Sequence, residues 1–208
     1  MEVIDTNTVV INSSDELKSV LEGDNLYNYI YFGNDITLSS GILINNNKTN
    51  ITIDGTYNNV RHKYIDMKST SYTNTIRANN LNNLIVVKNM DITGNNYYGV
   101  IYVLEDNKYK SVVVEYNNVT YTGVQMCFHP VGLTRFIDVN VTVETGYVTG
   151  NEIAECNSIE IGGNSKFIHR STANSSFWFR NTNPSLKILS NSNVYFESIS
   201  RELLYGTT

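Results

Sequence analysis

The chain is poor in charge, proline, cysteine and tryptophan. Only 17% of its 208 residues are charged, and the formal net charge is −5 without a cluster of basic residues. We therefore expect no nucleic-acid partner, because phosphate backbones are bound through grouped lysines and arginines. The sequence also lacks an apolar run of the roughly 18 residues that a membrane helix needs. Insertion into a membrane is not expected.

Two further features concern the cellular compartment of the protein. Residues 1–5 do not have the basic and apolar segments of a secretion signal. The protein is then either intracellular or has lost its signal. The two cysteines, Cys127 and Cys156, do not have the spacing of a metal site. Unpaired thiols packed in the core are favoured over a disulfide.

Asparagine, threonine and tyrosine take the place of charge. The chain has 31 asparagines, 20 threonines and 15 tyrosines. Threonine and tyrosine favour strands, whereas asparagine tolerates turns and left-handed backbone. Short β-branched runs alternate with Asn/Gly/Asp turns from residue 27 onward, which predicts an all-β protein.

Asparagine also recurs in the spacing apolar-x-x-Asn-x-x-apolar. The copies are centred on Asn89, Asn140, Asn164 and Asn191, and a further copy has Tyr116 in place of asparagine. The steps between the centres are 27, 24, 24 and 27 residues. Such a period, with two or three short strands per repeat, predicts a right-handed parallel β-helix. The asparagines are expected to be structural, stacked at a bend as a hydrogen-bonded ladder. An antiparallel β-sandwich ranks second.

We expect a single domain over residues 1–208. A short N-terminal capping helix is predicted at residues 13–23, because Ser13 and Glu16 fit a capping box and Gly23 fits a stop. Leu17, Val20 and Leu21 would form its apolar stripe. The remaining divisions are first coils at 27–55, an inserted polar loop at 56–75, regular coils at 76–198 and a C-terminal tail or cap at 199–208.

Three stretches carry a family resemblance. They are Asp15-Glu16-Leu17-Lys18, the predicted strand segment from Tyr29 to Leu38, and Asn50-Ile51-Thr52-Ile53-Asp54-Gly55-Thr56. Together with the repeats that follow them, to about Phe196, these stretches make the chain resemble the pectate-lyase-like adhesive domain of Firmicute (Clostridium-type) surface proteins. The resemblance implies a right-handed parallel β-helix and a role in attachment. It also implies an extracellular or cell-surface location.

The sequence does not predict a catalytic site. A β-helix lyase needs several carboxylates around one calcium ion and a basic group that takes a proton. The acids of the repeats, such as Asp91 and Asp138, occupy different positions relative to the repeated asparagine, and the arginines are scattered. We therefore predict no catalytic residues, metal ligands or cofactor. The alternative is a calcium-dependent polysaccharide (pectate-type) lyase or another glycan-active β-helix enzyme.

Binding is better supported by the residue types. Tyr97, Tyr98, Tyr102 and Trp178 are candidate binding residues, because exposed aromatic rings offer flat apolar faces with polar edges. The predicted partners are host or cell-wall glycans or surface proteins. The alternative interpretation is that each of these side chains simply packs within the coil. A purely structural spacer is a third possible role for the domain.

Overall fold

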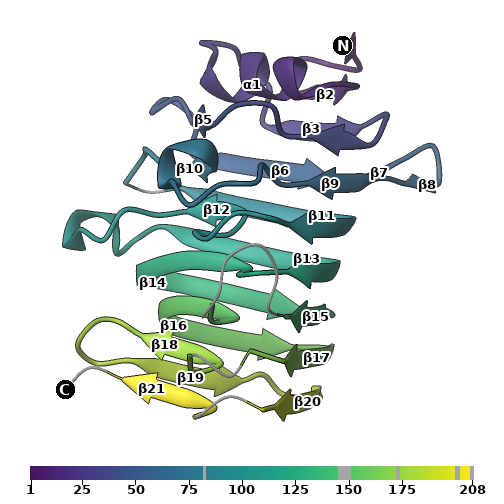
Figure 1. Cartoon of the computed structure of the whole chain (residues 1–208). Helices are drawn as coiled ribbons and strands as arrows, with labels where there is room; N and C mark the ends of the chain where they lie inside the picture. Colours follow the sequence, from purple (N-terminus) through teal and green to yellow (C-terminus); the bar gives the residue numbers. More distant parts are fainter. Residues whose placement is uncertain (82, 145–150, 172–173, 200–201, 207–208) are drawn as a thin grey trace.

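The chain winds into a parallel β-helix of about six turns, seen in the computed structural model (Figure 1). The structure describes residues 1–81, 83–144, 151–171, 174–199 and 202–206. Strands of successive turns pair in parallel, for example β11 with β13 over ten residue pairs. Among the described residues, antiparallel strand pairs occur only between β1 (Glu2–Val3) and β2 (Thr8–Ile11) and in the small hairpin of β7 (Thr56–Tyr57) and β8 (Val60–Arg61). The predicted fold class is confirmed, and the β-sandwich is not formed.

Each turn contributes strands to three faces, which we call A, B and C. Face A contains β2 (Thr8–Ile11), β3 (Tyr29–Phe32), β6 (Asn50–Asp54) and β19 (Ser185–Ile188), together with parts of four long strands. These long strands are β11 (Leu84–Gly94), β13 (Val113–Gly123), β14 (Cys127–Ile137) and β16 (Ala154–Gly162).

The other two faces are built from the remaining strands and from the other ends of the long ones. Face B contains β4 (Ile36–Thr37), β9 (Lys63–Ile65), β15 (Asn140–Val143), β17 (Asn164–His169) and β20 (Asn193–Ser198), with the second halves of β11 and β13. Face C contains β5 (Ile42–Leu43), β10 (Ile76–Arg77), β12 (Ile101–Tyr102), β18 (Phe177–Phe179) and β21 (Leu204–Gly206), with the first parts of β14 and β16.

The core runs along the axis in columns of inward side chains. Alternation places every second residue of a strand inside, and the parallel register puts like residues over like. Val87, Tyr116, Phe136 and Ile161 form one such column on face A. The rings of Tyr116 and Phe136 stack at 5.7 Å. Burying each of these large side chains stabilises the fold by about 1.5–3 kcal/mol.

The bends between faces A and B hold residues in the left-handed region. Asn89 (φ 54°) and Asn118 (φ 52°) are equivalent in register, since their neighbours on both sides pair. The Asn118 Nδ2 donates to Asn89 Oδ1 at 2.9 Å, and the Asn89 Nδ2 donates to Asp54 Oδ1 at 3.0 Å. An amide ladder therefore exists, with Asp54 as its first member.

The prediction that one asparagine ladder runs through all the repeats is wrong for the remaining repeats. Asn191 (φ 59°) is at a bend, but Asn140 and Asn164 lie just after bends formed by Asp138 (φ 52°) and Gly163 (φ 63°). Tyr116, aligned with Val87, belongs to the core rather than to the bend. The turns differ in length, so a nearly constant sequence step does not keep the register. Asparagine, aspartate and glycine all tolerate this backbone, so no single residue type marks it.

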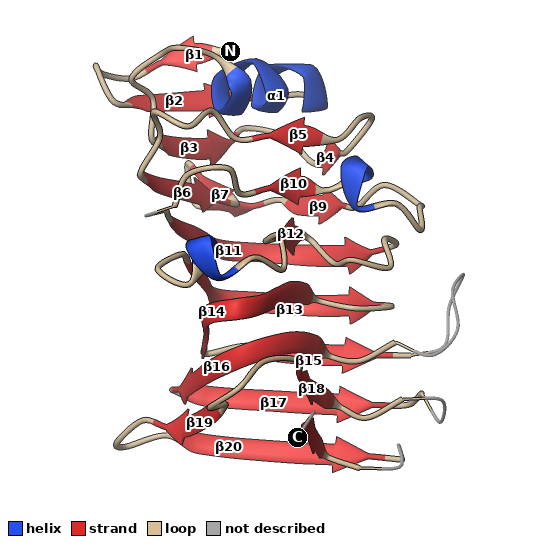
Figure 2. Ribbon diagram, turned by 90° about the vertical axis from the view of Figure 1, so that its left-hand side faces the viewer, coloured by secondary structure: helices blue, strands red, loops and turns tan. Residues whose placement is uncertain are grey.

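The helix α1 (Ser14–Glu22) covers the N-terminal end of the solenoid (Figure 2). Ser13 Oγ accepts from the Glu16 N–H at 3.2 Å, as the capping box predicts. The Glu16 carboxylate, however, accepts from the Asn12 N–H at 2.8 Å. The predicted apolar stripe is buried. Among the described residues, no helix has the length and hydropathy needed to cross a membrane.

Residues 56–75 do not form the predicted loop. They contain the hairpin of β7 (Thr56–Tyr57) and β8 (Val60–Arg61), then β9, which pairs in parallel with both β4 and β11. Tyr64 of β9 points inward and is 2% exposed. The prediction failed because this strand is only three residues long and is flanked by the polar residues His62 and Asp66. A 3-10 turn, Tyr72–Asn74, ends the segment.

The C-terminal end differs from the N-terminal end. In the predicted tail or cap, β21 pairs with β18 and extends face C. Residues 200, 201, 207 and 208 lie outside the described residues. Cys127 and Cys156 are both buried free thiols, as predicted. The short strand β1 (Glu2–Val3) completes the N-terminal end.

Candidate functional site

Face C carries a column of outward side chains, one from each turn. Successive pairings place Tyr102 next to Phe128, then Glu155, Trp178 and Tyr205. With about 4.8 Å between neighbouring strands, this column is roughly 20 Å long. Outward positions in a β-helix do not contribute to its core. The concentration of aromatic rings at these positions therefore points to a surface role.

Aromatic rings cluster in the upper half of this column. Tyr102 stacks on Tyr72 at 4.9 Å on one side and on Phe128 at 5.0 Å on the other. Tyr98 meets Phe128 edge-on at 5.3 Å, and Tyr97 packs edge-on against Tyr98 at 5.1 Å. Contacts of this kind fix ring orientations and contribute about 0.5–1.5 kcal/mol per pair. Tyr102 and Phe128 are buried by these contacts, so Tyr72, Tyr97 and Tyr98 form the exposed part of the cluster.

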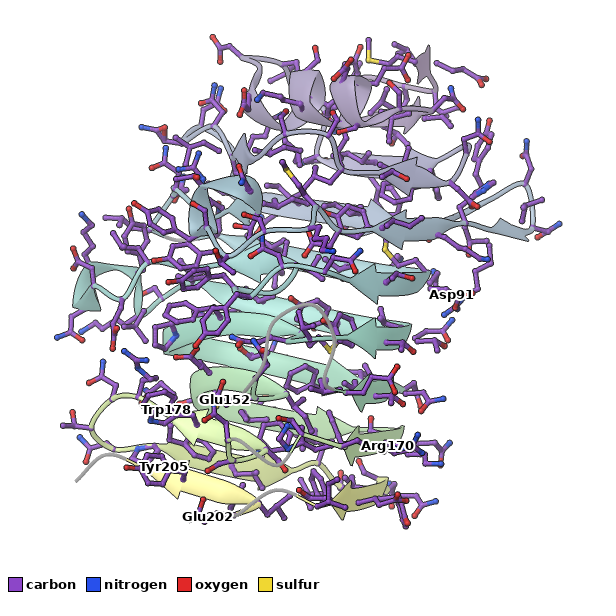
Figure 3. The ribbon with its side chains drawn as sticks, in the orientation of Figure 1. Asp91, Glu152, Arg170, Trp178, Glu202 and Tyr205 are labelled. Atoms are coloured by element: carbon purple, nitrogen blue, oxygen red, sulfur yellow. The ribbon has the colours of Figure 1, made fainter. Side chains whose placement is uncertain are left out.

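Trp178 and Tyr205 form a second aromatic group toward the C-terminal end (Figure 3). Their ring centroids are 5.9 Å apart. The Arg180 guanidinium lies 4.5 Å over the Trp178 ring and 5.9 Å from the Phe128 ring. This cation connects the two aromatic groups across the turn that carries Glu155.

Ion pairs hold Arg180 in place. It donates to Glu155 Oε2 at 2.7 Å and to Glu105 Oε2 at 2.9 Å. Glu155 is almost completely buried, and its second oxygen accepts from Gln125 Nε2 at 3.4 Å. Burial raises the pKa of Glu155, although Arg180 and Gln125 act to lower it. The chain therefore holds a desolvated carboxylate within the column, between Phe128 and Trp178.

Glu152 is a second buried acid on this face. It is 1% exposed, and its Oε2 has no hydrogen-bond partner in the described part of the chain. Burial, helped by the charge of Glu155, raises the pKa of Glu152 to about 8, while Asn174 lowers it by hydrogen bonding. The same two glutamates, together with burial, raise the pKa of Tyr97 to about 12. Glu152, Glu155 and Tyr97 are therefore electrostatic neighbours.

The comparison with protein families supports the fold and adds a general role. Residues 8–128, more than half of the chain, match the model of the pectate lyase-like adhesive domain. The chain belongs to that family. No curated protein and no solved structure matches the chain. The family description indicates an adhesion-type module, and an adhesive domain acts where it is exposed at a surface.

The four predicted binding residues of this adhesive domain lie on one side of the solenoid. Tyr97, Tyr98 and Tyr102 belong to one cluster, and Trp178 belongs to the lower group of the same face. Tyr97, Tyr98 and Trp178 are half-buried. Tyr102 is only 7% exposed, because Tyr72 and Phe128 cover both faces of its ring. Tyr102 therefore supports the cluster rather than offering a free ring face.

Sequence reasoning missed the partners that complete this surface. Those residues are Tyr72, Glu105, Phe128, Glu152, Glu155, Arg180 and Tyr205. A correct alignment of the face C strands would have placed several of them in one column. The repeat in the sequence aligned the bends between faces A and B instead. It carried no information on the register of face C.

Several other acids of the adhesive domain pair with arginines. Glu115 and Glu160 flank Arg135 on face A, at 3.9 and 2.8 Å. Asp91 pairs with Arg61 at 2.9 Å. In the described part of the chain, no group of three or more His, Cys, Asp or Glu residues is arranged to hold a metal ion.

Buried Cys127 and His129 do not form a nucleophile and base. Burial raises the pKa of the Cys127 thiol to about 12 and lowers the pKa of His129 to about 3. The thiol therefore stays protonated and the imidazole stays neutral at physiological pH. Thr134 Oγ1 lies 3.9 Å from the Cys127 sulfur and 3.2 Å from His129 Nδ1. These groups belong to the core.

Proposed function

We propose that this chain is a non-catalytic adhesion module of a bacterial cell-surface protein, of the Firmicute type, and that it binds its ligand along face C. The ligand would be a host or cell-wall glycan. A surface protein is the other partner class. The observation that carries the proposal is the register-aligned column of outward aromatic side chains, extended by Tyr72 and Tyr98. Flat rings with polar edges suit the apolar faces of sugar rings.

Binding to immobilised glycans and matrix proteins tests this proposal. We expect retention of the wild-type domain by at least one glycan class. Tyr98→Ala and Trp178→Ala should each weaken that retention tenfold or more. Tyr57→Ala in the β7–β8 hairpin is the matched control and should bind as wild type does. Equal binding by all variants, or binding to no glycan, would contradict the proposal.

A glycan-active enzyme is the second candidate, and Glu152 favours it. A buried carboxyl group whose pKa lies near neutrality is common at catalytic sites, where it can serve as a general acid. The test is incubation with pectate, alginate and neutral polysaccharides, with and without calcium. Unsaturated uronate is followed by ultraviolet absorbance, and new reducing ends are counted. Product that disappears in Glu152→Gln would support this candidate.

A further inference from the structure

The lower half of face C carries more negative than positive charge. Glu105 and Glu155 both pair with the single guanidinium of Arg180. Glu202 accepts from Ser175 Oγ at 2.8 Å, and the adjacent Asn174 is a hydrogen-bond partner of Glu152. Among the described residues of this group, the three carboxyl groups of Glu105, Glu152 and Glu155 thus lie near one cation, Arg180. An acidic glycan would be repelled here, whereas a cationic ligand would be attracted.

One carboxyl oxygen in this group lacks a hydrogen bond. Glu152 Oε2 is buried and has no hydrogen-bond partner among the described residues, and a buried polar oxygen without a partner is unfavourable. A ligand N–H group that reached this oxygen would recover part of that cost. Because Glu152 is 1% exposed, a neighbouring side chain must first change rotamer. Among the described residues, its charged and titratable neighbours are Glu155, Arg180, Tyr97 and Cys156.

The aromatic rings of the same region suit a cation as well. Arg180 already lies over the Trp178 ring, and a positive charge is attracted to the face of tryptophan more than to any other ring. Tyr205 is 46% exposed next to it. Arg77 also brings a positive charge to face C, but it lies next to Tyr102 at the other end of the column. A cation is thus favoured in the lower half only.

We propose that the ligand of face C is a glycan chain with free amino groups, and that one of its ammonium groups binds among Trp178, Glu152 and Glu155. This proposal rests on the proposed function, because it names the ligand class of the same surface. The sugar rings lie along the aromatic column, and the ammonium charge is balanced by the excess carboxylate. An acidic polysaccharide such as pectate is disfavoured at this position.

The test uses oligomers of one length that differ only in charge. Glucosamine oligomers, their N-acetylated forms and oligogalacturonate are titrated at pH 6 while fluorescence is followed. The chain has one tryptophan, so the signal reports on Trp178. We expect the amino form to bind at least tenfold more tightly than the N-acetylated form, with a preference that shrinks as salt is added. Oligogalacturonate should not bind.

The outcomes separate this inference from the proposed function. Equal or tighter binding of the neutral or acidic oligomer overturns the amino-glycan inference and leaves glycan adhesion standing. If calorimetry and fluorescence both find no binding of any oligomer, the amino-glycan inference is overturned, whereas the proposed function is overturned only if the immobilised glycans and matrix proteins also retain nothing. Glu105→Gln should reduce the preference for the amino form about threefold or more. Glu2→Gln, a charge change at an exposed residue of β1 at the N-terminal end, is the matched control.

Proton release gives an independent readout of Glu152. An ammonium group at Oε2 favours the carboxylate, so binding should expel the Glu152 proton to the buffer near pH 7. Calorimetry in two buffers with different ionisation enthalpies measures this release. We expect release of a fraction of one proton in the wild type and none in Glu152→Gln. Equal release in both proteins would overturn the assignment of Glu152.

Discussion

Asp66, which follows β9, shows how strongly burial acts on a single residue. It is 2% exposed, and its carboxylate accepts from the Met67 N–H at 2.8 Å. Burial raises the pKa of Asp66 from 3.8 to about 8, although its hydrogen bonds lower it. The folded protein therefore binds this proton more tightly than the unfolded chain does. The resulting stabilisation is complete below about pH 4 and is lost as the pH rises toward 8.

Asp66→Asn should remove much of this pH dependence. The amide cannot ionise, so the variant should exceed the wild type in free energy of unfolding at pH 8 by about 2 kcal/mol or more. At pH 4 the difference should be small. Urea denaturation at both pH values measures the effect. Glu2→Gln, an exposed residue of β1, is the control, and the same pH dependence in all three proteins would contradict the prediction.

At the scale of single residues, the sequence predicts the features that depend on residues nearby in the chain. The Ser13 cap and the buried stripe of α1 follow from local spacing. The burial of Asp66 and Glu152 does not, because the groups around them come from other turns. Asn95 and Asn96, for example, lie one turn beyond Asp66 and bond to its surroundings. Only the register of the turns brings such residues together.

At the scale of elements, the bends between faces A and B tolerate few residue types. The Asn89 and Asn118 backbones have positive φ, where most side chains meet steric resistance. Their amides also bond along the axis. The backbone requirement and the side-chain hydrogen bond are separate contributions, and substitutions can distinguish them.

Asn118→Val should destabilise the protein more than Asn118→Gly does. Both lose the bond to Asn89, but valine also meets a left-handed cost of about 1–2 kcal/mol. Chemical denaturation measures the difference. The neighbouring Asn117 lies in the extended part of β13, so Asn117→Val should be close to neutral. Equal stability of the two Asn118 variants would show that this backbone imposes no constraint.

The same bends explain why the sequence predicts the fold class but not the alignment of the turns. Repeated apolar residues around asparagine reveal that the chain forms a solenoid. They do not reveal how many residues each turn uses, because Asp138 and Gly163 replace asparagine at the bend. Face C was therefore not aligned from sequence. Its aromatic column emerges only from the strand pairs.

At the scale of the molecule, the two ends are treated differently. Helix α1 covers the N-terminal end, where the inward side chains are fully buried. At the other end, Ile188 and Leu204 occupy inward register positions but are 49% and 47% exposed. Their equivalents one turn earlier, Ile161 and Phe177, are 0% exposed. Burial thus falls off along the axis.

Substitutions at equivalent positions should reflect this gradient. Phe177→Ala should lower the free energy of unfolding by about 3–5 kcal/mol, the usual cost for a buried phenylalanine. Leu204→Ala should cost less than about 1 kcal/mol, because its side chain is already half in water. Thermal and urea denaturation measure both. A large loss of unfolding free energy in Leu204→Ala would show that another molecule covers this end in solution.

The winding of the chain also has an evolutionary consequence. Each turn adds one side chain to the column on face C, so the length of this column changes in steps of one turn. Duplication or loss of a complete coil would lengthen or shorten the contact surface by one position and leave every bend as it was. Relatives could thus adapt to longer or shorter ligands without rebuilding their interior.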